Sequence, residues 1–180
     1  MQTYIAMLRG INVSGQKMIK MEALRVALAE LGLNNIRTYI QSGNIIFESP
    51  EKESGSLVKL IEAKILEKFG FQVPVIIRTP NEIKDAIATN PFLKTDSLDN
   101  AKLYLTFLAE IPGPDKIEKL NTFSYSPEEF ILINKDVYLY CPSGYGNAKL
   151  NNNFFENKLK TKATTRNWQT VNKLLELSKT

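Results

Sequence analysis

The stretch "NIRTYIQSGNIIFES", residues 35–49, contains two short apolar runs separated by Gln41, Ser42 and Gly43. β-branched and aromatic residues dominate both runs, as is typical of strands. Polar turn residues followed by a glycine, which tolerates positive φ, favour a tight reversal of the chain. The stretch therefore predicts a β-hairpin, and its neighbours on either side decide which fold contains it.

Strand and helix patterns alternate around this hairpin. A covered strand, "TYIAML" (3–8), and an amphipathic helix, "MEALRVALAELG" (21–32), precede it, while the helix "LVKLIEAKILEKFG" (57–70) and the strand "VPVIIRT" (73–79) follow it. The predicted order is βαββαβ. This order is typical of a ferredoxin-like unit, in which two helices cover one face of a four-stranded antiparallel sheet.

The second half of the chain nearly repeats this order. Strands are predicted in "KLYLTFLAE", "EFILIN" and "DVYLYC", and helices in "PGPDKIEKLNTF", "NNNFFENKLK" and "TTRNWQTVNKLLEL". No closing strand is apparent. We therefore expect an α+β protein with two tandem ferredoxin-like subdomains, the second lacking a clear final strand and followed by extra C-terminal helices. The expected bounds are 1–80, a linking helix and loop at 81–100, and 101–180. One continuous α+β domain is the alternative.

Composition restricts the chemistry. The 180 residues include one cysteine and no histidine, so imidazole bases, histidine metal ligands and Ser-His or Cys-His pairs are excluded. The aspartates form no metal-binding cluster, and we expect neither a metal nor a cofactor. No apolar run is long enough to span a bilayer, and the N-terminus does not resemble a secretion signal, so a cytoplasmic location without membrane partners is expected.

Charge is distributed unevenly along the chain. The net charge is +4 overall, but residues 149–180 contain seven Lys or Arg against two Glu, and residues 9–37 contain five against two. The remainder is therefore acidic. Two basic ends suit an anionic partner such as nucleic acid or a phosphorylated small molecule, although basic faces can also be simply solvated.

The segment "LRGINVSGQKMIK" (8–20) spaces Gly10 and Gly15 like the glycines of a phosphate-binding loop. Such a loop needs a lysine and a hydroxyl directly after the second glycine, and here Gln16, Lys17 and Met18 follow. The lysine is one position late and the hydroxyl is missing. Nucleotide hydrolysis of that type is therefore disfavoured.

A second candidate anion site lies near the C-terminus. In "TTRNWQTVNKLLEL" (164–177), Thr164 or Thr165 is expected to cap a helix, which places Arg166 and Asn167 in its first turn. Backbone donors, the positive helix end and a guanidinium together favour an anion. The alternative is a structural cap, with Arg166 paired to a carboxylate.

Several short words occur together in this chain: "LRGINVSGQKMIKMEALR", "GLNNIRTYIQSGNIIFES", "FQVPVIIRTPNEI", "NPF" and "ATTRNWQTVNKLLEL". With these words the chain resembles the uncharacterised bacterial family known as domain of unknown function 1697. The resemblance implies a cytoplasmic α+β protein and names no activity. Members have G-I-N-V-G-G-K-N where this chain has "GINVSGQK", so Ser14 and Gln16 depart from the pattern.

These words place polar residues on loops and at element ends, where binding surfaces are commonly built. The candidate ligand-binding residues are Arg9, Asn12, Lys17, Gln41, Ser42, Asn44, Arg166 and Asn167. We expect the first connection and the hairpin to lie at opposite ends of their sheet, so that a single groove needs the C-terminal helix, or the second half of the chain, to bridge them.

Three classes of function remain open. A binding module for an anionic ligand is favoured, an enzyme without histidine or metal is the first alternative, and an interaction or structural module is the second. No catalytic residue is assigned. The absence of histidine makes an enzyme the less favoured class. Oligomeric state is not predicted.

Overall fold

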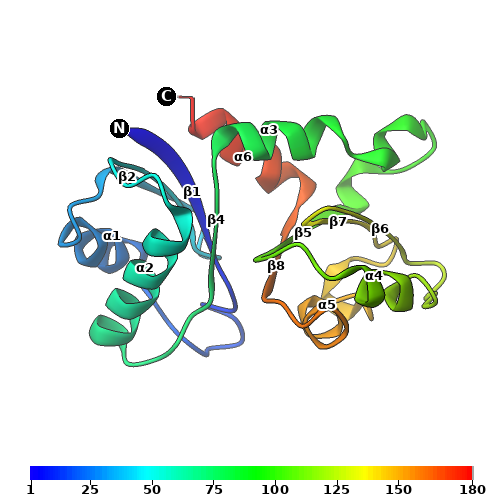
Figure 1. Cartoon of the computed structure of the whole chain (residues 1–180), viewed down its shortest axis with the longest axis horizontal. Helices are drawn as coiled ribbons and strands as arrows, with labels where there is room; N and C mark the ends of the chain where they lie inside the picture. Colours follow the sequence, from blue (N-terminus) through cyan, green and yellow to red (C-terminus); the bar gives the residue numbers. More distant parts are fainter. Residues whose placement is uncertain (180) are drawn as a thin grey trace. The chain divides into compact units, whose positions relative to one another are not determined.

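The computed structural model describes residues 1–179 and contains two four-stranded antiparallel sheets (Figure 1). Clustering of contacts divides the chain into two compact units. The first unit comprises Met1–Lys84 and the chain from Leu174 onward, and the second comprises Asp85–Lys173.

The first unit follows the predicted order of elements. Its strands are β1 (Gln2–Leu8), β2 (Asn34–Tyr39), β3 (Asn44–Ser49) and β4 (Val75–Arg78), and its helices are α1 (Met21–Ala29) and α2 (Ser54–Phe69). The strands lie in the order β2-β3-β1-β4, and every neighbouring pair is antiparallel. The predicted hairpin is confirmed.

One face of the first sheet packs on α1 and α2. Alternate residues of β1, such as Tyr4, Ala6 and Leu8, are buried in one core with Leu24 of α1 and Ile61 of α2. This burial follows from the period-two pattern of the strands and the helical spacing of the apolar residues. The helix α2 ends at Gly70, whose left-handed backbone closes the last turn.

The second unit has the same order of elements. Its strands are β5 (Leu103–Leu108), β6 (Glu129–Ile133), β7 (Asp136–Tyr140) and β8 (Ala163–Asn167), and its helices between strands are α4 (Pro114–Leu120) and α5 (Asn152–Leu159). The strands lie in the order β6-β7-β5-β8, again antiparallel throughout. Phe155 and Leu159 of α5 lie in its core with Leu108, Val137 and Leu139.

The strand β8 corrects the prediction that the second half lacks a closing strand. It pairs with β5 so that Arg166 lies opposite Leu105 and Thr164 opposite Phe107. Two consecutive threonines favour extended backbone, and helical spacing of apolar residues begins only at Trp168. The expected helix was therefore placed too early, and α5 is an integral helix of the unit rather than an addition.

The helices α3 (Pro80–Ala88) and α6 (Trp168–Leu177) complete the regular structure, with short 3-10 turns at Pro91–Lys94, Asn100–Lys102 and Tyr145–Asn147. The start of α6 is capped by Asn167, whose Oδ1 accepts the Thr170 N–H at 2.8 Å. Capping by Thr164 or Thr165 is therefore wrong.

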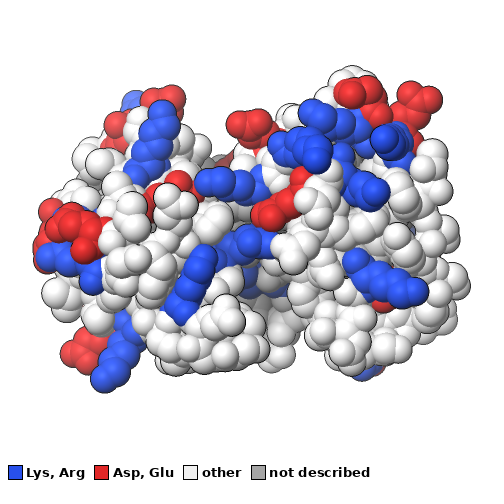
Figure 2. Space-filling view, turned by 90° about the horizontal axis from the view of Figure 1, so that it is seen from below, with Lys and Arg blue, Asp and Glu red and all other residues white. Residues whose placement is uncertain are grey.

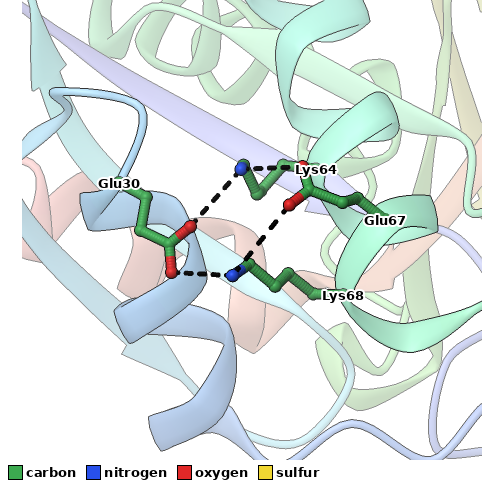
Figure 3. A network of polar contacts seen from close by, with 4 residues as sticks. All are labelled: Glu30, Lys64, Glu67 and Lys68. Carbon is green, nitrogen blue, oxygen red and sulfur yellow. Dashed lines mark hydrogen bonds and ion pairs between the residues drawn. The ribbon is translucent and has the colours of Figure 1, made fainter.

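Charged side chains differ in arrangement between the two units. Figure 2 shows Lys and Arg side chains gathered over part of the second unit, with acidic side chains at the margin. In the first unit, α1 and α2 are linked by the polar network of Figure 3, in which Lys68 Nζ lies 2.9 Å from Glu30 and Lys64 Nζ lies 2.8 Å from Glu67. The hydrogen bond from Lys68 lowers the pKa of Glu30. Ion pairs of this kind, in which one partner at least is exposed, contribute little to stability.

Candidate functional site

Three connections meet at one end of the first sheet: residues 9–20 after β1, residues 40–43 between β2 and β3, and residues 70–74 before β4. The reason is the strand directions. Both β1 and β2 run antiparallel to β3, so they end on the same side, and β4 begins there because it is antiparallel to β1. The first and third connections can be followed in Figure 1. We call this region the loop end.

The expectation that the first connection and the hairpin lie at opposite ends of the sheet is therefore wrong. The helix α1 returns the chain to the end of the sheet at which β1 began. The strand β2 therefore runs in the same direction as β1, and both strands finish at the same end of the sheet. Hydrogen bonds confirm the proximity: Leu8 N–H donates to Gly43 O at 2.8 Å, and Asn12 Nδ2 donates to Gln41 O at 2.8 Å. A shared surface needs no bridging helix.

The first connection contains a small hairpin of its own. Val13 and Gln16 form an isolated antiparallel bridge, and the two residues between them, Ser14 and Gly15, have φ of 50° and 73°. Two successive positive φ values are typical of the turn that matches the twist of a two-residue hairpin. The Asn12 N–H donates to Lys17 O at 3.2 Å and closes the base of this turn. The side chains of residues 13–18 are exposed.

Asn12 fastens this hairpin to the rest of the unit. Besides its bond to Gln41, its Nδ2 donates to Ile19 O at 2.9 Å, and its Oδ1 accepts the Ile19 N–H at 2.8 Å. Its φ of 55° lies in the left-handed region that asparagine tolerates better than most residues. Asn12 has a structural role in the loop end, because both the nitrogen and the oxygen of its side-chain amide form hydrogen bonds.

Two further bonds attach the third connection. Arg9 N–H donates to Pro74 O at 3.0 Å, and Lys17 Nζ donates to Gln72 O at 2.7 Å. Because an ammonium group has three donors, this bond leaves Lys17 with donors for other acceptors. The three connections thus form one continuous, mutually bonded surface.

The hairpin is held by Asn44 and shaped by Gly43. Asn44 is fully buried, and its Nδ2 donates to Tyr39 O and to Ser42 Oγ, both at 3.0 Å. Gly43 has φ of 80°, and a Cβ there would lie 2.8 Å from Leu8 Cβ. Close approach of the hairpin to β1 therefore requires glycine.

The three connections contain only cationic charges. Residues 9–20, 40–43 and 70–74 include Arg9, Lys17 and Lys20 and no Asp or Glu. Lys17 and Lys20 are exposed, and Arg9 is half-buried. Beside the third connection, the carboxylate of Glu62 in α2 accepts the Val75 N–H at 2.9 Å. The exposed charge of the loop end is positive.

A hollow of about 470 Å³ opens beside Lys20, between α1 and the end of α2. Its apolar lining includes Ala23, Val26 and Phe69, and its charged lining includes Glu22, Glu30 and Lys68. Glu30 and Lys68 belong to the network of Figure 3. The hollow is shallow and mixed in charge, and Lys20 belongs to both the hollow and the loop end.

The structure brings six predicted site residues together at the loop end: Arg9, Asn12, Lys17, Gln41, Ser42 and Asn44. Sequence reasoning assigned no role to Lys20 or to residues 70–74. The absence of acidic residues in all three connections was a signal that could have identified them, once the hairpin topology was drawn correctly.

The other two predicted residues belong to the second unit. Arg166 lies in β8 rather than in a first helical turn, is 8% exposed, and donates from Nη1 to Thr164 Oγ1 and Thr165 O, both at 2.9 Å. Burial lowers the pKa of Arg166 to about 10. Asn167 caps α6. The predicted position of Arg166 at a helix N-terminus is therefore wrong.

Comparison with known proteins agrees with the resemblance seen in the sequence. A family model described as "Protein of unknown function (DUF1697)" matches residues 1–138. The chain belongs to this family. The match includes the whole loop end and stops before β8.

A solved structure has a similar fold. The conserved bacterial protein SP0830 from Streptococcus pneumoniae superposes with a TM-score of 0.76 at 23% sequence identity, and the match covers 99% of both chains. A search of curated proteins found no match. At this identity the likeness describes the fold of the whole chain and no activity.

Two properties of the described residues bear on partners. Within residues 1–179, no helix combines the length and apolar character needed to cross a membrane. The same residues contain no group of three or more Cys, Asp or Glu placed to hold a metal ion.

Proposed function

We propose that the protein binds a phosphate-bearing anionic ligand at the loop end of the first unit. One observation carries the proposal: the first of three hydrogen-bonded connections presents Arg9, Lys17 and Lys20, and none of the three contains an acidic residue. Phosphate oxygens are strong acceptors for ammonium and guanidinium donors. A surface already ordered by its own bonds loses less conformational freedom on binding.

The residues of the loop end divide into two roles. Lys17, Lys20 and Arg9 supply charge, and the exposed Gln41 side chain supplies an amide. Asn12, Ser42 and Asn44 hold the connections in place through the bonds described above. The hollow beside Lys20 offers room for the part of a ligand that carries no phosphate.

Both nucleic acid and a phosphorylated small molecule share the required chemistry. We keep the two as separate arms of one experiment. The prediction that Arg166 and Asn167 contact the same anion stays a prediction, because both lie in the second unit.

The test is calorimetric titration at low salt with pyrophosphate, a nucleoside diphosphate and a short oligonucleotide in turn. We expect the Lys17→Gln change to weaken binding of the best ligand about tenfold, since a charge-assisted hydrogen bond is lost. The Lys59→Gln change, at an exposed lysine of α2 outside the loop end, is the matched control and should change nothing.

The three titrations distinguish a phosphorylated small molecule from nucleic acid. Binding of the small phosphates with the same sensitivity to Lys17 supports a small-molecule ligand, and binding of the oligonucleotide alone supports nucleic acid. The proposal fails when a double change of Lys17 and Lys20 to Gln leaves every titration unchanged.

We infer that both units are ferredoxin-like, a reading supported by their matching element and strand orders. We keep the subdomain bounds 1–80 and 101–180, with residues 81–100 as the link. A cytoplasmic location is supported by the single cysteine, Cys141, which is buried.

A further inference from the structure

The second unit carries an aromatic cluster at the end opposite to its β5–α4 connection. Residues 121–128, between α4 and β6, place Phe123 and Tyr125 against Phe154 of α5. The ring centroids lie 5.8 Å and 5.5 Å from that of Phe154, with interplanar angles of 89° and 85°. All three side chains are half-buried, so part of each ring contributes to the surface.

A lysine lies over each of the two outer rings. Lys158 Nζ is 4.2 Å from the centroid of Phe123, and Lys149 Nζ is 5.6 Å from the centroid of Tyr125. Each cation therefore lies over one face of its ring. Both lysines have flexible stems; Lys149 is exposed and Lys158 is half-buried.

We propose that Phe123 and Tyr125 form a platform for two successive bases of a single-stranded nucleic acid, with Lys158 and Lys149 binding the adjoining phosphates. Each lysine would leave its ring face as a base takes its place. Stacking of a base on an aromatic ring is stronger than an exposed cation–π contact, so the exchange is favourable. The ammonium group then gains a phosphate in place of the ring.

The surrounding charges suit a polyanion. Residues 114–128 and 149–162 contain six lysines against Asp115, Glu118, Glu128 and Glu156. Two of these carboxylates are turned toward the backbone: Glu128 accepts the N–H groups of Lys149 and Leu150 at 3.1 Å and 3.0 Å, and Glu156 accepts that of Ala163 at 3.0 Å. Figure 2 shows Lys and Arg side chains gathered over part of this unit.

The arrangement favours single strands over other polyanions. Bases paired in a duplex are stacked on one another and cannot reach two protein rings, while a ligand of phosphate alone would use the lysines and not the rings. The rings lie beside the helices of the unit, so this surface differs from the strand-face platform of an RNA recognition motif.

The experiment is fluorescence anisotropy of the full chain with labelled oligo(dT) and oligo(U) of about ten nucleotides, a length within the usual range for one small domain. A duplex of equal length and inorganic phosphate as a competitor are the other arms. We expect binding to either single strand that weakens steeply with salt, and weaker binding to the duplex. Equal binding of both oligomers indicates recognition without the 2′-hydroxyl, and preference for oligo(U) indicates RNA; both support the platform.

Variants that keep the fold separate the rings from the charges. Phe123→Leu and Tyr125→Leu retain apolar volume and should each weaken single-strand binding about tenfold. Phe130→Leu should not, because it alters another half-buried ring of this unit over which no lysine of the described residues 1–179 lies. Lys158→Gln should lower the salt slope by about one. Circular dichroism checks that each variant folds.

Three outcomes overturn the proposal. The first is that no single strand binds at low salt. The second is that Phe123→Leu and Phe130→Leu weaken single-strand binding equally. The third is that the duplex binds as tightly as the single strand and that its affinity is unchanged by either ring substitution. If Phe123→Leu fails to fold, Tyr125→Leu and Lys158→Gln decide the question. Because these residues lie outside the loop end, failure here leaves the anion site of the first unit untouched.

Discussion

The two units share one order of strands, but their long connections lie at opposite ends of the sheet. In the first unit, the connection after β1 spans residues 9–20, against residues 109–113 after β5 in the second. At the other end the relation is reversed: residues 30–33 join α1 to β2, whereas residues 121–128 join α4 to β6, and residues 141–151 join β7 to α5. One scaffold therefore carries its long connections at two different ends.

The content of the long connections differs as much as their position. Those of the first unit contain several glycines, are bonded to one another through Asn12, and display cations. Those of the second unit carry aromatic rings beneath lysines. In both units the sheet and its helices supply stability, while the long connections supply the surface chemistry.

The largest effect is expected at the closest approach in the first unit. The Gly43→Ala change should lower the free energy of unfolding by about 3 kcal/mol, because it adds left-handed strain and a Cβ 2.7 Å from Ile11 Cδ1. Urea unfolding measures it. The control is Gly15→Ala, where φ is +73° and a Cβ meets nothing within 4 Å; about 1 kcal/mol is expected there. If the two substitutions lowered the free energy of unfolding equally, close packing around residue 43 would not be what requires glycine there.

A second test compares an asparagine from each unit. Asn12 and Asn134 both have φ of 55°, but Asn12 joins two connections whereas the exposed Asn134 lies in the short turn between β6 and β7. Asn12→Ala should cost about 2 kcal/mol of unfolding free energy, since three hydrogen bonds of its side chain are lost. Asn134→Ala should cost no more than about 1 kcal/mol of the same quantity.

The outcome that matters is the difference between these variants. A similar cost at both positions would mean that the amide of Asn12 adds nothing beyond its backbone conformation. Chemical denaturation followed by circular dichroism is sufficient to decide. The same Asn12→Ala protein should also bind the anionic ligand more weakly, because its loop end is no longer held in place.

The smallest expected effect at neutral pH concerns the core of the second unit. Burial raises the pKa of the Cys141 thiol to about 12, so the native protein keeps this proton where the unfolded chain loses it, above about pH 8.5. Stability from the buried neutral thiol is thus present below that pH and is lost as the pH rises toward 12.

Wild type should therefore lose stability relative to Cys141→Ala with rising alkalinity, by up to about 1.4 kcal/mol per pH unit. Urea unfolding at several values between about pH 8 and pH 10 measures the difference. The lowered pKa of Arg166 acts with the opposite sign, but it is common to both proteins and cancels. Parallel pH profiles would show that the thiol is not protected by burial.

Sequence patterns identified most elements correctly because their periodicity is local. The apolar spacing of Leu24 and Leu28 predicts α1, and the alternation around Gln41 predicts the hairpin. The strand β8 was missed because "ATTRN" lacks a strong apolar alternation, and its threonines also suit a helix cap. Only pairing with β5, far away in the sequence, makes it a strand.

The candidate site shows the same division. The residues Arg9, Lys17 and Gln41 could be singled out from their loops, but their proximity could not, because it depends on the directions of three strands. Likewise, the rings of Phe123 and Tyr125 meet Phe154 only when α5 packs beside residues 121–128.

By itself, the sequence determined where most helices and strands occur, which turns need glycine or asparagine, and which classes of chemistry the absence of histidine excludes. The tertiary structure alone decided that three separate connections without acidic residues share one end of a sheet, that Arg166 is buried in a strand, and that lysines lie over half-buried rings. Periodicity reflects forces between neighbours in the chain, whereas these arrangements arise from pairing and packing between segments distant in sequence.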